Sequence, residues 1–217
     1  MKLTREQIAA RVAQDIPEGA YVNLGIGVPT LVADFLPEDK EIVLHTENGM
    51  LGMGRAALPG EVDDDLINAG KISVTEEAGA SYFHHADSFA MMRGGHIDYC
   101  VMGAYQVSAR GDLANWRTNS TTSIPGVGGA MDLAAGAKHV FVVMELFSKD
   151  GACKLVEHCS YPLTSTECVE RVYTDIAVFD IVPAGVQVLE IFDDLTVSGL
   201  SDLVGFDLID ATIVASH

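Results

Sequence analysis

The stretch that decides the fold runs from residue 97 to residue 102 and reads IDYCVM. A second run of the same kind, HVFVVMEL, spans residues 139–146. Short, almost continuously apolar runs are typical of strands that are covered on both faces by helices. The two runs therefore predict a central, mostly parallel sheet in an α/β fold.

The segments around these runs alternate between the patterns of strands and helices. Further strands are predicted at 21–24, 41–45 and 72–74, and helices at 4–16 (with Thr4 and Gln7 as a capping box), 29–35, 87–92 and 131–135. In the last third, partly alternating stretches predict antiparallel or edge strands at 171–181 and 185–192, followed by a helix at 196–203.

The stretch from residue 46 to about residue 70 is rich in glycine and acidic residues and is expected to be a loop. Without repeats or an obvious linker, the 217 residues are expected to form a single domain, 1–217. Its open sheet would gather its loops at the strand ends.

Composition excludes several classes of function. Hydrophobic residues make up 48% of the chain and charged residues 20%, as in ordinary soluble proteins. A formal net charge of −18 argues against binding to nucleic acid. No apolar run approaches the roughly 20 residues that span a bilayer, and the N-terminus lacks the apolar core of a signal peptide. We expect a cytoplasmic protein without membrane contact, whose four cysteines are free thiols.

Two glycines near the N-terminus invite a dinucleotide-binding interpretation. Gly25 and Gly27 follow a predicted strand and precede a predicted helix, and Glu47 ends the next strand. The third glycine of that motif is replaced by Thr30, however, and Pro29 removes an N–H that a phosphate would need. A tight turn without a ligand is the alternative for Gly25.

The segment 46–54, TENGMLGMG, carries the strongest chemical pattern. A carboxylate, Glu47, ends a strand, and the pair Asn48-Gly49 that follows it readily adopts positive φ. Such a turn can project the carboxylate into a cleft, although an ordinary surface turn has the same spacing. The loop 125–132, PGVGGAMD, precedes a helix and presents successive N–H groups that can stabilise an oxyanion; a plain helix-entry loop is its alternative.

Other candidates are weaker on their spacing. The adjacent pair His84 and His85 would point to opposite faces of a strand and lacks a third ligand, so no metal site is predicted. Glu145 ends the second apolar run and is a rival catalytic carboxylate, for which a structural role at the sheet edge is the alternative.

The segment 46–54 resembles the S-E-N-G-x-L-G-x-G signature of the 3-oxoacid CoA-transferase B subunits, and the similarity covers nearly the whole chain. It continues through NLGIG (23–27), DLINAGK (65–71), SFAMMRGGH (88–96), GDLANW (111–116) and GGAMD (128–132). Within the family, the resemblance is closest to the 3-oxoadipate (β-ketoadipate) group in GAYVN (19–23), FHHADSF (83–89) and YPLT (161–164). Thr46 replaces the usual Ser, and Arg55 replaces the usual Pro.

The resemblance implies a ping-pong transfer of CoA from succinyl-CoA to a 3-oxo acid, with 3-oxoadipate as the expected acceptor. Glu47 would be the nucleophile that carries CoA as a thioester, and the Gly129 N–H would bind the oxyanion together with a group of an A subunit. No metal or other cofactor is expected, and the A subunit would complete a heterodimer or an α2β2 assembly. The residues expected to contact substrate or CoA are Gly25, Gly27, Asn48, Gly49, Lys71, Gly126, Val127, Gly128 and Ala130.

Three alternatives stay open. The acceptor could be acetoacetate, which would make the chain the B subunit of a succinyl-CoA:3-ketoacid CoA-transferase. More remotely, the same scaffold could serve a sugar-phosphate isomerase that uses Glu47 as a base, or a non-catalytic regulatory partner.

Overall fold

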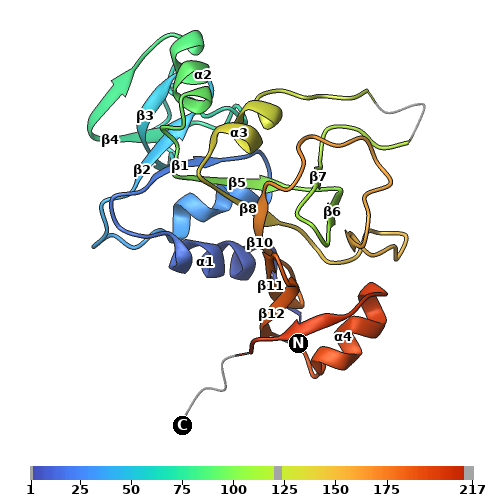
Figure 1. The fold of residues 1–217 in the computed structure, drawn as a ribbon. Helices are drawn as coiled ribbons and strands as arrows, with labels where there is room; N and C mark the ends of the chain where they lie inside the picture. Colours follow the sequence, from blue (N-terminus) through green and yellow to red (C-terminus); the bar gives the residue numbers. More distant parts are fainter. Residues whose placement is uncertain (1, 120–123, 213–217) are drawn as a thin grey trace.

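A computed structural model describes residues 2–119 and 124–212 of the chain (Figure 1). Within these ranges, one large sheet has the strand order β13-β12-β11-β10-β8-β5-β1-β2-β3-β4, and a small sheet has the order β7-β6-β9. The strands of the large sheet are β1 (Tyr21–Leu24), β2 (Val43–Thr46), β3 (Met50–Ala56), β4 (Val74–Tyr82), β5 (Tyr99–Gly103), β8 (His139–Val143), β10 (Val169–Tyr173), β11 (Ala177–Val182), β12 (Gly185–Ile191) and β13 (Leu208–Asp210). The small sheet consists of β6 (Gln106–Ser108), β7 (Leu113–Ala114) and β9 (Leu155–Val156), and the helices are α1 (Arg5–Asp15), the 3₁₀-helix η1 (Val28–Phe35), α2 (His85–Arg93), α3 (Ala130–Gly136) and α4 (Val197–Val204).

The middle of the large sheet is parallel. Strands β2, β1, β5, β8 and β10 run in one direction, whereas β11 and β12 pair antiparallel at one end of the sheet. This arrangement confirms the predicted α/β class, including the antiparallel strands of the C-terminal third. The predicted strand at 171–181 forms two strands, because Thr174 turns the chain by accepting hydrogen bonds from the Ile176 and Ala177 N–H groups.

The expectation of a loop between residues 46 and 70 is wrong for its first part. Residues 50–56 form β3, which pairs with β2 and with the nine-residue strand β4. The glycines Gly52 and Gly54 hide the strand, since they interrupt the alternation of side chains by which strands are recognised. Pairing between segments that are distant in sequence decides this region, and the same applies to the short strands β6, β7, β9 and β13 that the sequence did not predict.

Two apolar layers lie on opposite faces of the sheet. Along β5, Cys100 and Met102 pack into one layer with residues of α2, α3 and α4. Val101 points to the opposite face and packs with residues of α1 and η1. Figure 1 shows α1 below the central strands and α2 and α3 above them. This two-sided burial explains why the runs at 97–102 and 139–146 are apolar almost throughout.

Local signals define most of the helices. The predicted capping box at the start of α1 is confirmed: Thr4 Oγ1 accepts from Gln7 N at 3.3 Å, and Gln7 Oε1 accepts from Thr4 N at 2.9 Å. The predicted helix at 29–35 forms as the 3₁₀-helix η1, with Pro29 in its first turn. No helix in the described ranges is long and apolar enough to cross a membrane.

Helices α2 and α3 approach each other through a glycine. A Cβ on Gly136 would overlap the carbonyl oxygen of Met92, so only glycine allows the last turn of α3 to lie against α2. The close contact matters for the site described below, because these two helices flank it.

Replacing Gly136 with alanine should force the helices apart and lower the free energy of unfolding by roughly 1–3 kcal/mol, as overpacking does in other cores. Urea unfolding of the two proteins measures the difference. The matched control is Gly199→Ala in α4, where the nearest atom to the new methyl group lies at 3.5 Å. This variant should be as stable as the original protein or more so, because alanine favours a helix. An equal loss in both variants would contradict the packing argument.

Candidate active site

The candidate site lies where the order of the parallel strands reverses. Strand β1 has β2 on one side and β5 on the other, and the chain crosses over to reach each of them. In open α/β sheets, such a point leaves a crevice outside the carboxyl ends of the strands. Because β1 and β2 are parallel, the predicted segments 25–27 and 47–49 leave the sheet at this same edge.

Glu47 is the first residue of a tight hairpin turn. Residues 47–49 connect β2 to β3, and the Gly49 N–H donates to the Thr46 carbonyl oxygen at 3.1 Å. Gly49 has a φ of 115°, and a Cβ there would overlap the carbonyl oxygen of Phe83. The turn predicted from Asn48-Gly49 is therefore confirmed, and both the backbone conformation and the space require glycine at position 49.

Gly129 lies directly against the Glu47 carboxylate. A Cβ built on Gly129 would be 2.6 Å from Oε2 and 2.9 Å from Cδ of Glu47. Within residues 2–119 and 124–212, neither the Glu47 carboxylate nor the Gly129 N–H has a hydrogen-bond or ion-pair partner. The structure thus brings together the two residues that the sequence singled out.

One more of the predicted segments, the loop around Lys71, is tied to the Glu47 turn. Asn48 Nδ2 donates to the Ile67 carbonyl oxygen at 2.8 Å, which links the turn to the loop that carries Lys71. The buried Asn68 shapes this loop by accepting from Gly70 N at 2.9 Å and from Ile72 N at 3.1 Å. Lys71 lies between these two donors, is exposed and has a positive φ of 63°.

The glycines of the site differ in what they do. Gly25 continues the pairing of β1 with β5, because its N–H donates to the Val101 carbonyl oxygen at 2.8 Å, and a Cβ would come within 3.1 Å of that atom. Gly27, Gly126 and Gly128 have open space where a Cβ would be. Around them, Val127 accepts from the N–H of Ala130, the first residue of α3, at 3.1 Å. The open positions leave room for a ligand along the loop 126–130, and Gly25 needs no ligand to explain it.

A family model described as Coenzyme A transferase matches residues 5–191 of the chain. The chain belongs to this family. It is 60% identical over 208 residues to the B subunit of the 3-oxoadipate CoA-transferase of Pseudomonas putida, covering 96% of this chain and 97% of the relative. It is 57% identical to the B subunit of the same name in Acinetobacter baylyi, covering 97% of both chains. With the B subunit of a probable succinyl-CoA:3-ketoacid coenzyme A transferase of Bacillus subtilis, identity is 49% over 91% of both chains.

Solved structures share the fold of this CoA-transferase family member at low sequence identity. The acyl-CoA transferase YdiF of Escherichia coli O157:H7 aligns with a TM-score of 0.74 and 19% identity over 97% of this chain, which spans only 43% of the YdiF chain. Glutaconate coenzyme A-transferase of Acidaminococcus fermentans aligns with a TM-score of 0.70 and 14% identity, over 99% of this chain and 90% of that one.

The rival carboxylate of this CoA-transferase chain is already engaged. Glu145 accepts from Arg5 Nη2 at 3.0 Å, in an ion pair that ties the start of α1 to the segment that follows β8. The pair His84-His85 is not on a strand as expected, since His84 caps α2 and His85 is its first residue. In the described ranges, no group of three or more His, Cys, Asp or Glu side chains is arranged to hold a metal ion.

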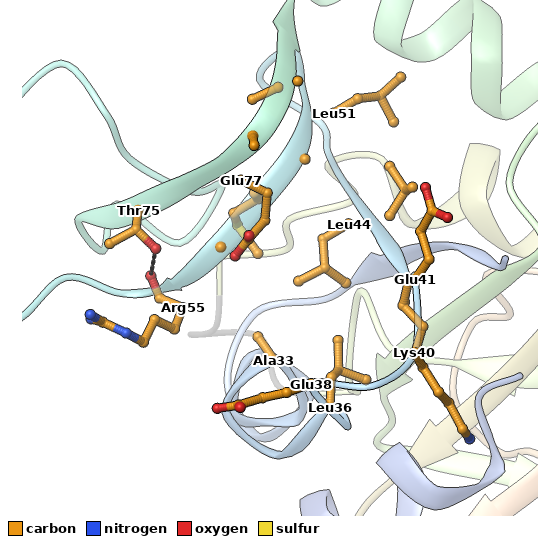
Figure 2. Close-up of a pocket in the computed structure, with 18 of the residues that line it drawn as sticks. Ala33, Leu36, Glu38, Lys40, Glu41, Leu44, Leu51, Arg55, Thr75 and Glu77 are labelled. Atoms are coloured by element: carbon orange, nitrogen blue, oxygen red, sulfur yellow. Dashed lines mark hydrogen bonds between the residues drawn. The ribbon is translucent and has the colours of Figure 1, made fainter. Parts of the chain in front are cut away.

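A large groove of about 990 Å³ lies elsewhere, between η1 and the ribbon formed by β3 and β4. Figure 2 shows Leu44 and Leu51 on its wall and Glu38 and Glu77 around it. Neither Glu47 nor Gly129 lines this groove, so the groove is separate from the candidate active site despite its size. Arg55, which departs from the family signature, lies beside the groove and pairs with Glu61 at 2.8 Å.

A buried polar network beneath Glu47 was not predicted from the sequence. Asn23 Nδ2 lies 3.0 Å from His45 Nδ1, and His45 Nε2 lies 3.0 Å from Ser88 Oγ. The Asn23 amide also donates to the His45 carbonyl oxygen at 3.2 Å, which fixes its orientation. Nδ1 of His45 must therefore accept, and Nε2 carries the proton. Burial lowers the pKa of His45 to about 4, so the ring is neutral at physiological pH. The sequence signal that could have indicated this network is the presence of polar residues, Asn23 and His45, within short apolar strands.

Replacing Gly129 with alanine should displace the Glu47 carboxylate without unfolding the chain, because the methyl group would meet the flexible end of a side chain. We expect transfer of CoA to fall by at least roughly 100-fold, the scale of losing one oxyanion donor or of a misplaced reacting group. A coupled transfer assay and a melting curve measure both effects. The control Gly199→Ala should keep the original rate, and a fully active Gly129→Ala protein would contradict this geometry.

His45 should make stability depend on pH. An unfolded His45 takes up a proton near its ordinary pKa of 6.5, whereas the folded one stays neutral down to about 4. The contribution of the neutral His45 ring to the free energy of unfolding is therefore fully present above pH 6.5. It is lost as the pH falls towards 4, which lowers the free energy of unfolding by up to about 3 kcal/mol. Urea unfolding between pH 7.5 and 4.5 should show a steeper loss for the original protein than for His45→Gln. Parallel curves would show that the ring is not buried in its neutral form.

Proposed function

We propose that the chain is the B-type subunit of a 3-oxoacid CoA-transferase, in which Glu47 carries CoA as a thioester. The observation that carries this proposal is the contact between the Glu47 carboxylate and Gly129, at 2.6 Å from Oε2 to the position of a Cβ. The reaction would move CoA from succinyl-CoA to a 3-oxo acid. The 60% identity to the B subunit of a 3-oxoadipate CoA-transferase makes 3-oxoadipate the first acceptor to test.

The proposed chemistry needs a carboxylate and an oxyanion donor. A Glu47 oxygen attacks the thioester carbonyl, and the tetrahedral intermediate expels CoA thiolate to leave a mixed anhydride. The thiolate then attacks the Glu47 carbonyl of the anhydride, which releases succinate and leaves the glutamyl-CoA thioester. The 3-oxo acid enters as a carboxylate and reverses these steps. Each step exchanges an acyl group between oxygen and sulfur, so electrons and protons balance without a metal or a redox cofactor.

Gly129 would stabilise the negative oxygen that each attack creates. Its N–H has no acceptor among the described residues, and a preorganised donor of this kind contributes about 3–4 kcal/mol in comparable acyl chemistry. The open positions at Gly126 and Gly128 would admit the pantetheine arm of CoA, past Val127 and Ala130. Contacts of Gly27, Asn48 and Lys71 with CoA or substrate belong to the same proposal, with Lys71 as the cation for a phosphate or carboxylate.

A second chain completes the proposed enzyme. The relatives in Pseudomonas putida and Bacillus subtilis are named as B subunits, which implies an A-type partner. With a net charge of −18, this chain offers little positive potential for the anionic CoA, so the partner would supply much of it. We infer a heterodimer or an α2β2 assembly. The four free cysteines suit a reducing compartment such as the cytoplasm.

The acceptor separates the two closest functions. The Bacillus subtilis relative, at 49% identity, is named a probable succinyl-CoA:3-ketoacid coenzyme A transferase. Acetoacetate is therefore the second candidate for the acceptor acid. Assaying the paired subunits with succinyl-CoA and each acid distinguishes the two. A value of kcat/KM that is higher for 3-oxoadipate supports the first choice, and a higher value for acetoacetate overturns it.

The covalent step has a direct test. With its A-type partner and succinyl-CoA alone, the chain should gain a CoA adduct on the peptide that contains Glu47, detected by mass spectrometry. Glu47→Ala should form no adduct and should keep its fold, whereas Glu145→Gln should form the adduct normally because Glu145 pairs with Arg5. An adduct on Glu145, or substantial transfer by Glu47→Ala, would refute the proposed role.

A further inference from the structure

Helix α2 holds the two backbone carbonyl groups on either side of the Glu47 Cα atom. Ser88 Oγ donates to the Thr46 carbonyl oxygen at 3.1 Å, and His85 Nδ1 lies 2.9 Å from the Glu47 carbonyl oxygen. A carbonyl oxygen only accepts, so Nδ1 of His85 carries a proton and donates. His85 and Ser88 are three residues apart, which places them on the same side of the helix.

Ser88 is itself held from below by the buried network. Asn23 donates to His45 Nδ1, and His45 Nε2 donates to Ser88 Oγ at 3.0 Å. The Ser88 oxygen is thus occupied as an acceptor, and its own proton is directed to the Thr46 carbonyl. All three side chains are at most 2% exposed, so water does not compete for these hydrogen bonds.

The same helix also contacts the other half of the candidate site. Cζ of Phe89 lies 3.2 Å from the position that a Cβ would take on Gly129. Further along α2, Arg93 Nε pairs with Asp132 Oδ1 of α3 at 2.6 Å. Helix α2 therefore touches both the turn that carries Glu47 and the loop that carries Gly129.

The Glu47 side chain depends on this backbone support. Its carboxylate has no hydrogen-bond or ion-pair partner among the described residues, and it extends from a hairpin loop of three residues. With no such bond from the described residues, the direction of the side chain depends on the orientation of the peptide groups around its Cα atom. A rotation of the turn would move the carboxylate away from Gly129.

We propose that His85 and Ser88, with His45 behind Ser88, are positioning residues that hold the Glu47 carboxylate against Gly129. This inference rests on the proposed function, since it assigns the residues a task in the covalent step at Glu47. They act through the backbone of the turn and need no contact with the substrate.

The exposed residue His85 offers a test with little risk of unfolding. His85→Ala removes the donor to Glu47, whereas His85→Asn keeps an amide N–H near the place of Nδ1. In the complex with the A-type partner, His85→Ala should form the glutamyl-CoA adduct roughly 10–100-fold more slowly, the scale of a small misplacement of reacting groups. His85→Asn should recover most of that loss. Values of KM for both substrates should stay within about twofold, because positioning of the nucleophile affects the chemical step.

Ser88→Ala tests the buried arm against a matched control. Ser108 is also 0% exposed and also donates to an acceptor, Asp112 Oδ2 at 2.8 Å, but it lies in the small sheet. Both serine variants should lose stability, as buried serines whose partners are left unsatisfied do. Only Ser88→Ala should slow adduct formation. Similarly, His45→Gln, which keeps a donor towards Ser88, should be faster than His45→Leu.

The outcomes separate the two proposals. If the original protein forms no adduct at Glu47, the proposed function fails. If it forms the adduct and His85→Ala and Ser88→Ala form it at the original rate, the positioning role is wrong while the function stands. A rate loss of the same size in Ser88→Ala and Ser108→Ala would show a general effect of stability and would also overturn the positioning role.

Discussion

The contact between Glu47 and Gly129 is the constraint on which the rest of the site depends. A side chain atom at position 129 would lie 2.6 Å from Glu47 Oε2, so only a glycine leaves the carboxylate in place. In the proposed mechanism, the Gly129 N–H, which has no acceptor among the described residues, would stabilise the negative charge that develops during acyl transfer. Gly49 serves the other side of this contact, because its positive φ and its tight fit against Phe83 shape the turn that presents Glu47.

The architecture around the contact divides the work between sheet and helices. The parallel strands β1 and β2 deliver the segments 25–27 and 47–49 to one edge of the sheet, at the point where the strand order reverses. Helices α2 and α3 then flank that edge and lie close together because Gly136 has no side chain. Polar residues buried between these elements, such as His45 and Ser88, form directional hydrogen bonds within a core that is otherwise apolar. A site of this kind gains its precision from rigid elements, although its two central groups lie on loops.

Much of the fold was readable from local patterns. The apolar runs at 97–102 and 139–146 predicted covered parallel strands, and both are buried from the two faces of the sheet. The Thr4 capping box marked the start of α1. By contrast, β3 was expected to be a loop, since Gly52 and Gly54 erase the alternation within it. Its pairing with β2 and β4 depends on hydrogen bonds between distant segments, which no short window of sequence contains.

For the site, the sequence by itself determined the residue types: a carboxylate before Asn48-Gly49, a glycine-rich loop around Gly129 and a resemblance that names their roles. The membership of the coenzyme A transferase family agrees with that resemblance. Only the tertiary structure decided that the Glu47 carboxylate faces Gly129 without a partner among the described residues, that Glu145 is paired with Arg5, and that His45 and Ser88 lie beneath the turn. The reason is physical: residue type and local turn propensity are properties of neighbouring residues, whereas burial, pairing and the availability of a carboxylate depend on which distant segments pack together.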